Sequence, residues 1–234
     1  MERHSVLGRA NLEEHIPENC LQLVEKVQLS DGYLNVPSGH QIYYRRAAPP
    51  ENNYTKATVV FLHGQSFTSS TWLEVKTLKI FAALGYNSIA IDLPGNGRSG
   101  QRSIDEKDKP SVLSEVLDAL EVGHVMVVAC SMAGQYILPL ITDPRLKCLV
   151  AIALSNTNEL SEERCRSVRT PVLVIHGEKD TSLGPSAANN LKHLANARFV
   201  KVAKAGHACY LGNPDDFHAY VYNFLDIVLK YPTT

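Results

Sequence analysis

Three polar residues of the types that make up a catalytic triad follow apolar runs of the chain in the order serine, aspartate, histidine. Ser131 comes after VMVVA, Asp180 after PVLVIH and His207 after ARFVKV. A serine hydroxyl becomes a good nucleophile when a neutral imidazole accepts its proton, and an acid must fix the tautomer of that imidazole. Taken singly, these residues are also typical of a helix cap, a turn and a buried structural histidine. Taken together and in this order, they predict a triad.

The sequence around Ser131 predicts a strained turn between a strand and a helix. A nucleophile on such a turn needs small residues two positions before and two positions after it. Those positions are usually glycine, and here they are Ala129 and Ala133. Alanine is small enough to fit, although the match is weaker than G-x-S-x-G. The alternative is that Ser131 caps the following helix.

Acyl transfer also needs two backbone N–H groups directed at the developing negative charge, and the loss of one costs about 3 kcal/mol of barrier. We expect Met132, which follows the nucleophile, and Gln65, which follows the strand-end His63, to supply them. His63 itself is expected to be structural. Three aromatic residues are candidates for lining an acyl pocket or for ordinary core packing: Phe67, Trp72 and Tyr210.

The elements that must position these residues are strands alternating with helices. We expect two opening antiparallel strands, VEKVQLS and HQIYYRR, and then strands at 57–63, 87–92, 125–129, 148–153, 171–176 and 197–202. Helices are expected at 72–84, 110–121, 132–141, 159–167, 185–195 and 214–230. This alternation predicts an eight-stranded, mostly parallel sheet flanked by helices, with ligands at the carboxyl ends of the strands. Together with the Ser–Asp–His order it indicates the α/β-hydrolase fold. Residues 1–22 are expected to form an N-terminal extension, loosely ordered or on the surface, and residues 23–234 the hydrolase domain.

The interval between Ser131 and Asp180 leaves no room for a cap domain, because a helix, a strand and their connections fill it. Only residues 154–167 could arch over the site. The sequence therefore predicts an uncapped site suited to small acyl groups or to an acylated side chain.

Composition and motifs argue against several other functions. The formal net charge is -1, which gives no basic field for nucleic acid or an anionic membrane. The polar start and the lack of a long apolar stretch predict no signal peptide and no membrane anchor, hence a cytoplasmic protein. The glycines of residues 95–100 spell G-x-G-x-x-G, but no helix is expected to start there, so nucleotide binding is not predicted. The five cysteines and the histidines show no metal-ligand spacing, so neither a disulfide framework nor a metal is predicted.

Five segments resemble the α/β-hydrolase domain-containing protein 14 family. They are LHGQSFTSSTW, AIDLPGNGRS, CSMAGQYILP, VRTPVLVIHGEKD and AGHACYLGNPDDFH. The resemblance covers about residues 24–230 and implies the same triad, although the family elbow S-x-S-x-S-G has serine where this chain has Ala129 and Ala133. The family has a cytosolic and nuclear member and a membrane-anchored one. Resemblance to the cytosolic and nuclear member implies hydrolysis of short acyl esters and removal of acetyl groups from protein lysines with transfer to coenzyme A. It also implies a transcription-factor partner.

Two interpretations follow from these observations. The first is an active short-chain acyl hydrolase or deacetylase. The second is a protein-interaction module on a weakly active or inactive hydrolase scaffold, for which the altered elbow and the missing cap are the support.

Overall fold

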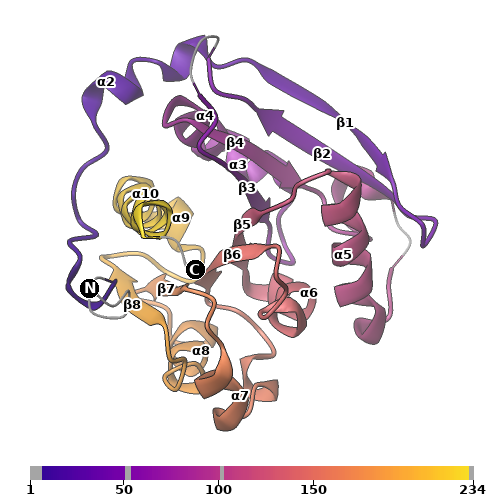
Figure 1. The fold of residues 1–234 in the computed structure, drawn as a ribbon, viewed down its shortest axis with the longest axis vertical. Helices are drawn as coiled ribbons and strands as arrows, with labels where there is room; N and C mark the ends of the chain where they lie inside the picture. Colours follow the sequence, from indigo (N-terminus) through magenta and orange to yellow (C-terminus); the bar gives the residue numbers. More distant parts are fainter. Residues whose placement is uncertain (1–6, 51–53, 101–102, 232–234) are drawn as a thin grey trace.

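An eight-stranded sheet forms the centre of the molecule in the computed structural model, which describes residues 7–50, 54–100 and 103–231 (Figure 1). The strands are β1 (Leu29–Asn35), β2 (Gln41–Ala47), β3 (Ala57–Leu62), β4 (Tyr86–Ile91), β5 (Val125–Cys130), β6 (Leu146–Ile152), β7 (Val172–Gly177) and β8 (Ala197–Val202). Their order across the sheet is β1-β2-β4-β3-β5-β6-β7-β8. β1 and β2 run antiparallel to their neighbours, and β4, β3, β5, β6, β7 and β8 are parallel. The α/β-hydrolase fold is confirmed.

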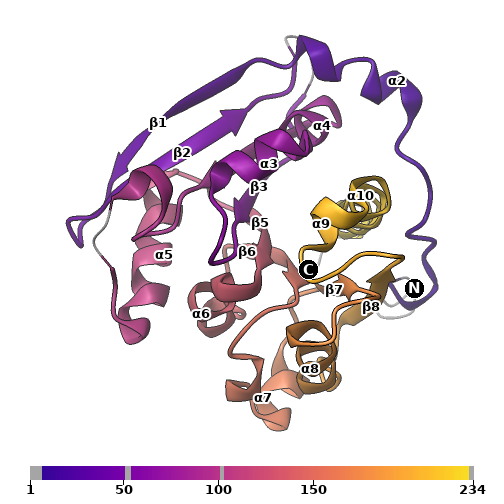
Figure 2. The same ribbon diagram turned by 180° about the vertical axis from the view of Figure 1, so that it is seen from behind.

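Helices cover both faces of the sheet (Figures 1 and 2). They are α2 (Glu18–Leu21), α3 (Ser69–Glu74), α4 (Thr77–Ala83), α5 (Lys109–Ala119), α6 (Gly134–Ile137), α7 (Glu162–Ser167), α8 (Leu183–Asn190), α9 (Cys209–Gly212) and α10 (Pro214–Lys230). Short 3-10 helices are η1 (Val24–Lys26), η2 (Gly97–Ser99), η3 (Glu106–Asp108), η4 (Ser131–Ala133), η5 (Leu138–Leu140) and η6 (Thr157–Glu159). One apolar core joins the sheet to α3, α4 and α10, and a second joins its other face to α5, α6 and α8. In β4, β5 and β7 every residue is buried, as expected of strands covered on both faces. No helix in the described ranges has the length and apolar character needed to span a bilayer.

The first strand lies further along the chain than the sequence pattern predicts. Val24–Lys26 forms η1, and β1 includes Asp31-Gly32, a dipeptide that is typical of turns. Gly32 pairs with Tyr44 of β2, and a Cβ on Gly32 would lie 3.0 Å from the Tyr44 hydroxyl oxygen. Glycine therefore makes room in this strand for a cross-strand aromatic ring, which is a packing effect that a local turn signal does not reveal.

Two of the expected helices are interrupted. The helix expected over 72–84 is two helices, α3 and α4, separated at Lys76, whose φ is 58°. The helix expected over 132–141 is the succession η4, α6 and η5. Pro139 lies in η5 and has no N–H to donate to the preceding turn, so a regular α-helix cannot continue through it.

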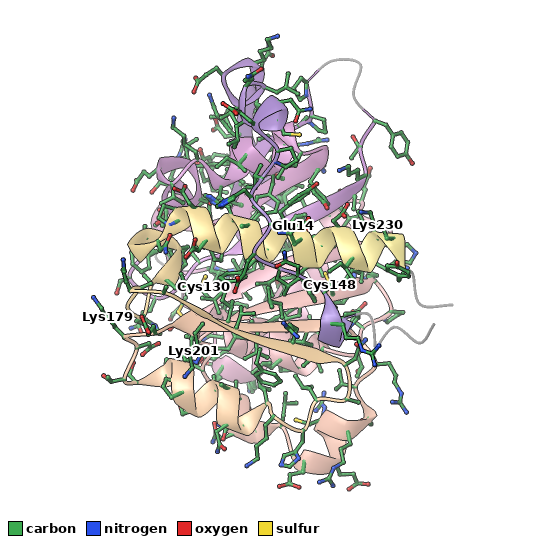
Figure 3. All side chains as sticks on the ribbon, turned by 90° about the vertical axis from the view of Figure 1, so that its left-hand side faces the viewer. Glu14, Cys130, Cys148, Lys179, Lys201 and Lys230 are labelled. Carbon is green, nitrogen blue, oxygen red and sulfur yellow. The ribbon has the colours of Figure 1, made fainter. Side chains whose placement is uncertain are left out.

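The described part of the N-terminal extension packs on the body of the protein. Leu7 and Leu12 are each 2% exposed and belong to the core that includes α10. The side-chain amide of Asn223 in α10 donates to the carbonyls of Leu12 and Glu14, at 3.1 and 2.8 Å. Figure 3 shows Glu14 beside α10. The described part of this segment is thus held against α10 by hydrogen bonds and apolar contacts.

Candidate active site

The carboxyl ends of three parallel strands bring the predicted triad to one edge of the sheet. Ser131 directly follows β5, Asp180 follows β7, and His207 follows β8. The Nδ1 atom of His207 lies 2.8 Å from Oδ2 of Asp180. Ser131 and His207 line the same pocket. The structure therefore assembles Asp180 and His207 into a hydrogen-bonded pair that faces the same cavity as Ser131.

Ser131 lies on a sharp strand-to-helix turn with a strained backbone. Its φ is 46°, in the left-handed region that residues with a Cβ rarely adopt. Its carbonyl accepts hydrogen bonds from the backbone N–H of Ser155, at 2.9 Å, and from the Ser155 hydroxyl, at 3.2 Å. Ala129 and Ala133 are both fully buried, so their small side chains fit the turn. Ser131 is the first residue of η4 and not its N-cap, so capping does not account for it.

Hydrogen bonds fix the carboxylate of Asp180 on both oxygens. Oδ1 accepts from the N–H and the hydroxyl of Ser182, at 2.9 and 2.8 Å, while Oδ2 accepts from the N–H of Gly184 at 3.1 Å and faces His207. Burial by itself would raise the pKa of Asp180, but the hydrogen bonds from His207 and Ser182 outweigh it and hold the pKa below its usual value. Asp180 is thus kept ionised and pointed at the imidazole. Sequence reasoning did not identify Ser182, although a hydroxyl two positions after an aspartate is typical of such a loop.

A glycine permits the close contact between the aspartate and histidine loops. A Cβ on Gly177 would lie 2.1 Å from the carbonyl oxygen of Gly206 and 2.4 Å from that of Ala205. The backbone N–H of Lys179 donates to the Ala205 carbonyl at 2.8 Å. Only a residue without a side chain allows the two backbones to approach in this way, which sets the distance between Asp180 and His207.

The loop after β3 lies against the nucleophile. A Cβ on Gly64 would lie 3.5 Å from Cβ of Ser131, so the adjacent Gln65 is on the correct loop to donate its N–H into the site. His63 holds this loop: its Nε2 accepts from the N–H of Leu93 at 2.9 Å, which leaves Nδ1 to donate to the Gly64 carbonyl at 2.7 Å. Burial lowers the pKa of His63, and a neutral imidazole fits both bonds. His63 is therefore structural.

Met132, the second predicted N–H donor, follows Ser131 in η4 and is partly buried. Together with Gln65 it places two candidate N–H groups on the two segments that flank the nucleophile. This is the arrangement that an oxyanion hole requires.

The pocket that contains Ser131 has a volume of about 230 Å³. Its lining residues are Gly64, Gln65, Ser66, Phe67, Cys130, Ser131, Ile152, His207, Ala208 and Tyr210. Two of the three candidate aromatic residues, Phe67 and Tyr210, line it, with ring centroids 6.0 Å apart. Trp72 does not: it is fully buried, and its ring centroid lies 4.8 Å behind that of Tyr210. Cys130, the residue before Ser131, also lines the pocket, as does Ile152, which no sequence motif identifies.

The segment 154–167 does not line the pocket of Ser131. Asn156, Glu159, Leu160 and Arg164 instead line a cavity of about 350 Å³ together with residues of η3, α5, α6 and η5. This segment therefore extends over α6, so no cap covers the pocket in the described part of the chain.

The G-x-G-x-x-G sequence has a structural explanation. The buried carboxylate of Asp92 accepts from the N–H groups of Ser69 and Arg98, at 2.7 and 2.8 Å. A Cβ on Gly97, whose φ is 50°, would lie 2.2 Å from Oδ2 of Asp92. The glycine is needed because the loop closes on this carboxylate.

The cysteines beside the site are buried thiols. Burial raises the pKa of Cys130 well above its usual value and raises that of Cys209 to about 12. Such thiols stay protonated and weakly reactive at neutral pH. In the described ranges no group of three or more His, Cys, Asp or Glu side chains could hold a metal ion.

Comparison with known proteins identifies the family to which this fold belongs. The family model "Alpha/beta hydrolase family" matches residues 59–157. "Putative protein-lysine deacylase ABHD14B" of Rattus norvegicus is 37% identical over 205 residues, which cover 85% of this chain and 97% of the relative. "Protein ABHD14A" of Mus musculus is 38% identical over 190 residues, which cover 80% of this chain and 76% of the relative.

A solved structure supports the fold independently. The crystal structure of a "predicted CIB-like hydrolase" from Thermoplasma acidophilum aligns with a TM-score of 0.75 at 24% identity and covers 85% of this chain and 98% of its own. The sheet order, the edge at which the candidate residues meet and these relatives agree. The chain belongs to the ABHD14 family of the α/β-hydrolase superfamily and is a hydrolase.

Proposed function

We propose that this hydrolase cleaves short-chain acyl esters or acylated lysine side chains through a Ser131–His207–Asp180 triad and an acyl-enzyme. The observation that carries the proposal is the 2.8 Å hydrogen bond between Asp180 and His207 at the pocket that Ser131 lines. The names of the rat relative and of a Mycobacterium tuberculosis esterase, 32% identical over 133 residues, point to the same class of reaction.

In the first half-reaction, His207 Nε2 removes the proton of Ser131 while the serine oxygen attacks the acyl carbonyl carbon. Asp180 holds Nδ1–H of His207, so Nε2 keeps its lone pair for this role. The backbone N–H groups of Gln65 and Met132 bind the oxyanion. The imidazolium then gives its proton to the departing alcohol or amine as the bond to the acyl carbon breaks.

In the second half-reaction, a water molecule attacks the acyl-Ser131 ester. His207 takes the proton of the water, and the carboxylic acid leaves as the proton returns to the serine oxygen. A thiol can take the place of water, in which case the product is a thioester. We extend the proposal to coenzyme A as such an acceptor on the strength of the family resemblance. A nuclear location of the enzyme and a transcription-factor partner stay predictions from the same resemblance, and a cytoplasmic location stays a prediction from the sequence.

The pocket volume favours a small acyl group. Pockets for drug-sized ligands measure about 300–1,000 Å³, whereas this one measures about 230 Å³. The paired Asp180 and His207 also favour the hydrolase over the interaction module, because a scaffold used only for binding needs no buried, fully hydrogen-bonded carboxylate behind an imidazole.

Steady-state assays with p-nitrophenyl acetate and an acetyl-lysine peptide, with and without coenzyme A, test the proposal. We expect turnover by the wild type and a fall in kcat of at least about 10⁴-fold in Ser131→Ala. Formation of acetyl-coenzyme A would identify transfer, and acetate would identify hydrolysis. Turnover of neither substrate, or turnover that survives Ser131→Ala, would contradict the proposed function.

A further inference from the structure

The pocket of Ser131 has an open end and a closed end. Gln65 and Ser66 are exposed at its mouth. The buried lining residues at its inner end include Cys130, Ile152 and Tyr210, each 1–2% exposed. A substrate therefore enters past the loop after β3, and its deepest part meets these three side chains.

The acyl group belongs at the closed end. The side chain of His207 is 39% exposed, and it must give its proton to the leaving group. The leaving group consequently departs on the solvent side of the imidazole. The acyl group, which stays bonded to Ser131, therefore occupies the inner end of the pocket.

Of the three inner residues, only Tyr210 blocks a path further into the protein. Cys130 and Ile152 are the last residues of the central strands β5 and β6, so the sheet itself lies beneath them. Tyr210 instead belongs to α9. Behind its ring are Trp72, at a centroid distance of 4.8 Å, and Phe217, at 5.9 Å.

The neighbours of Tyr210 hold its ring in place. Trp72 and Phe217 are fully buried, and the Tyr210 hydroxyl interacts with the thiol of Cys130, the residue before the nucleophile. A ring packed against two buried aromatic side chains has no space to rotate away and admit a longer chain. It forms a rigid wall at the end of the acyl site.

We propose that Tyr210 sets the upper limit on the length of the acyl chain that the enzyme accepts. The inference rests on the proposed acyl hydrolysis at Ser131. Replacement of the ring by a smaller side chain opens the pocket toward Trp72 and Phe217, whose faces offer an apolar surface to additional methylene groups.

The test is a chain-length profile measured with p-nitrophenyl acetate, butyrate, hexanoate and octanoate. Each methylene accepted or rejected by an apolar pocket changes kcat/KM by about tenfold or more. We expect the wild type to favour acetate or butyrate. In Tyr210→Ala the hexanoate-to-acetate ratio of kcat/KM should rise by at least about tenfold.

Three further variants separate the wall from other effects. Tyr210→Phe keeps the ring and should keep the wild-type profile. Tyr210→Leu fills more apolar volume than Tyr210→Ala and provides a second measurement of the chain-length profile. It is needed if thermal unfolding shows that the alanine variant is not folded. Phe81→Leu changes a fully buried ring that packs on Phe61 and Tyr86 and lies outside the pocket, so it should lower stability without changing the profile.

The outcomes distinguish this inference from the function on which it rests. No turnover of any ester or of the acetyl-lysine peptide by the wild type would refute the proposed function. A wild type that is active on acetate, with the same profile in Tyr210→Ala and Tyr210→Leu, would overturn the inference alone. A shift in Tyr210→Phe equal to that in Tyr210→Ala would also overturn it, because the hydroxyl and not the ring would then set the limit.

Discussion

Replacement of Asp180 by asparagine tests the electrostatic basis of the candidate triad. An asparagine NH₂ at the position of Oδ2 would face two donors, Nδ1–H of His207 and the N–H of Gly184. With the amide flipped, the NH₂ would face the N–H of Ser182. In the first orientation His207 adopts the other tautomer, and Nε2 can no longer accept the proton of Ser131. In both orientations the negative charge that stabilises the imidazolium is lost.

The expected magnitude follows from the loss of this negative charge together with the loss of tautomer control. In a serine-protease triad the same aspartate-to-asparagine change lowers kcat by about 10⁴-fold while the geometry is retained. We expect a loss of this order for Asp180→Asn in p-nitrophenyl acetate hydrolysis, together with a similar slowing of labelling by a fluorophosphonate. Thermal unfolding of the same sample shows whether the variant is folded.

Asp143→Asn is the matched control. Asp143 is a partly buried carboxylate whose pKa is held low by Arg145, 2.7 Å away, and it lies outside the pocket. We expect this variant to lose some stability and to keep its activity. Retention of more than about a tenth of the wild-type kcat by Asp180→Asn would refute the role given to Asp180, since a lost tautomer control costs far more.

Two further predictions concern loop contact and pH. Gly177→Ala should lower kcat by about 10²-fold, because the new Cβ would displace the histidine loop at Ala205 and Gly206, and a displacement of about 1 Å costs that much. Gly206→Ala is the control, since a Cβ there has open space, and its kcat should stay near that of the wild type. Equal kcat values for the two variants would contradict the role given to Gly177. Burial lowers the pKa of His218 to about 4, and Thr77 bonds its Nε2 at 2.8 Å. Below about pH 6.5 the unfolded chain therefore binds a proton at His218 that the native state does not bind, and from there to pH 5 the free energy of unfolding should fall by about 2 kcal/mol. Urea titrations of His218→Phe should lack this fall. The same pH dependence in the variant and the wild type would contradict the role given to His218.

The residues at the strand ends were predictable because their positions depend on alternation alone. Long buried strands such as β5 and β7 are visible as apolar runs, and the residue after such a run must lie at the carboxyl edge of the sheet. Ser131, Asp180 and His207 follow this rule. Their assembly required only that β5, β7 and β8 be parallel and end at the same edge of the sheet, with β6 between β5 and β7.

Features that depend on contacts between distant segments were not predictable in this way. Gly32 is read as a turn locally, but the ring of Tyr44 determines its place in a strand. The burial of Leu7 and Leu12 depends on α10, more than 200 residues away, through Asn223. A single sequence carries no signal for either contact.

Pocket lining shows the same limit. Phe67, Trp72 and Tyr210 are alike as apolar aromatic residues, yet two of them line the cavity and Trp72 lies behind it. Which ring is in front depends on the path of the chain through α9, a helix of four residues that has no clear periodic signal. Its position became clear only from the assembled structure.

The most direct test of Ser131 as the nucleophile is peptide mapping of the protein after reaction with a fluorophosphonate. The expected result is a single phosphonyl adduct on the peptide that contains Ser131, absent in Ser131→Ala and formed more slowly in Asp180→Asn. No adduct on the folded wild type, or an adduct on another residue that persists in Ser131→Ala, would contradict the account.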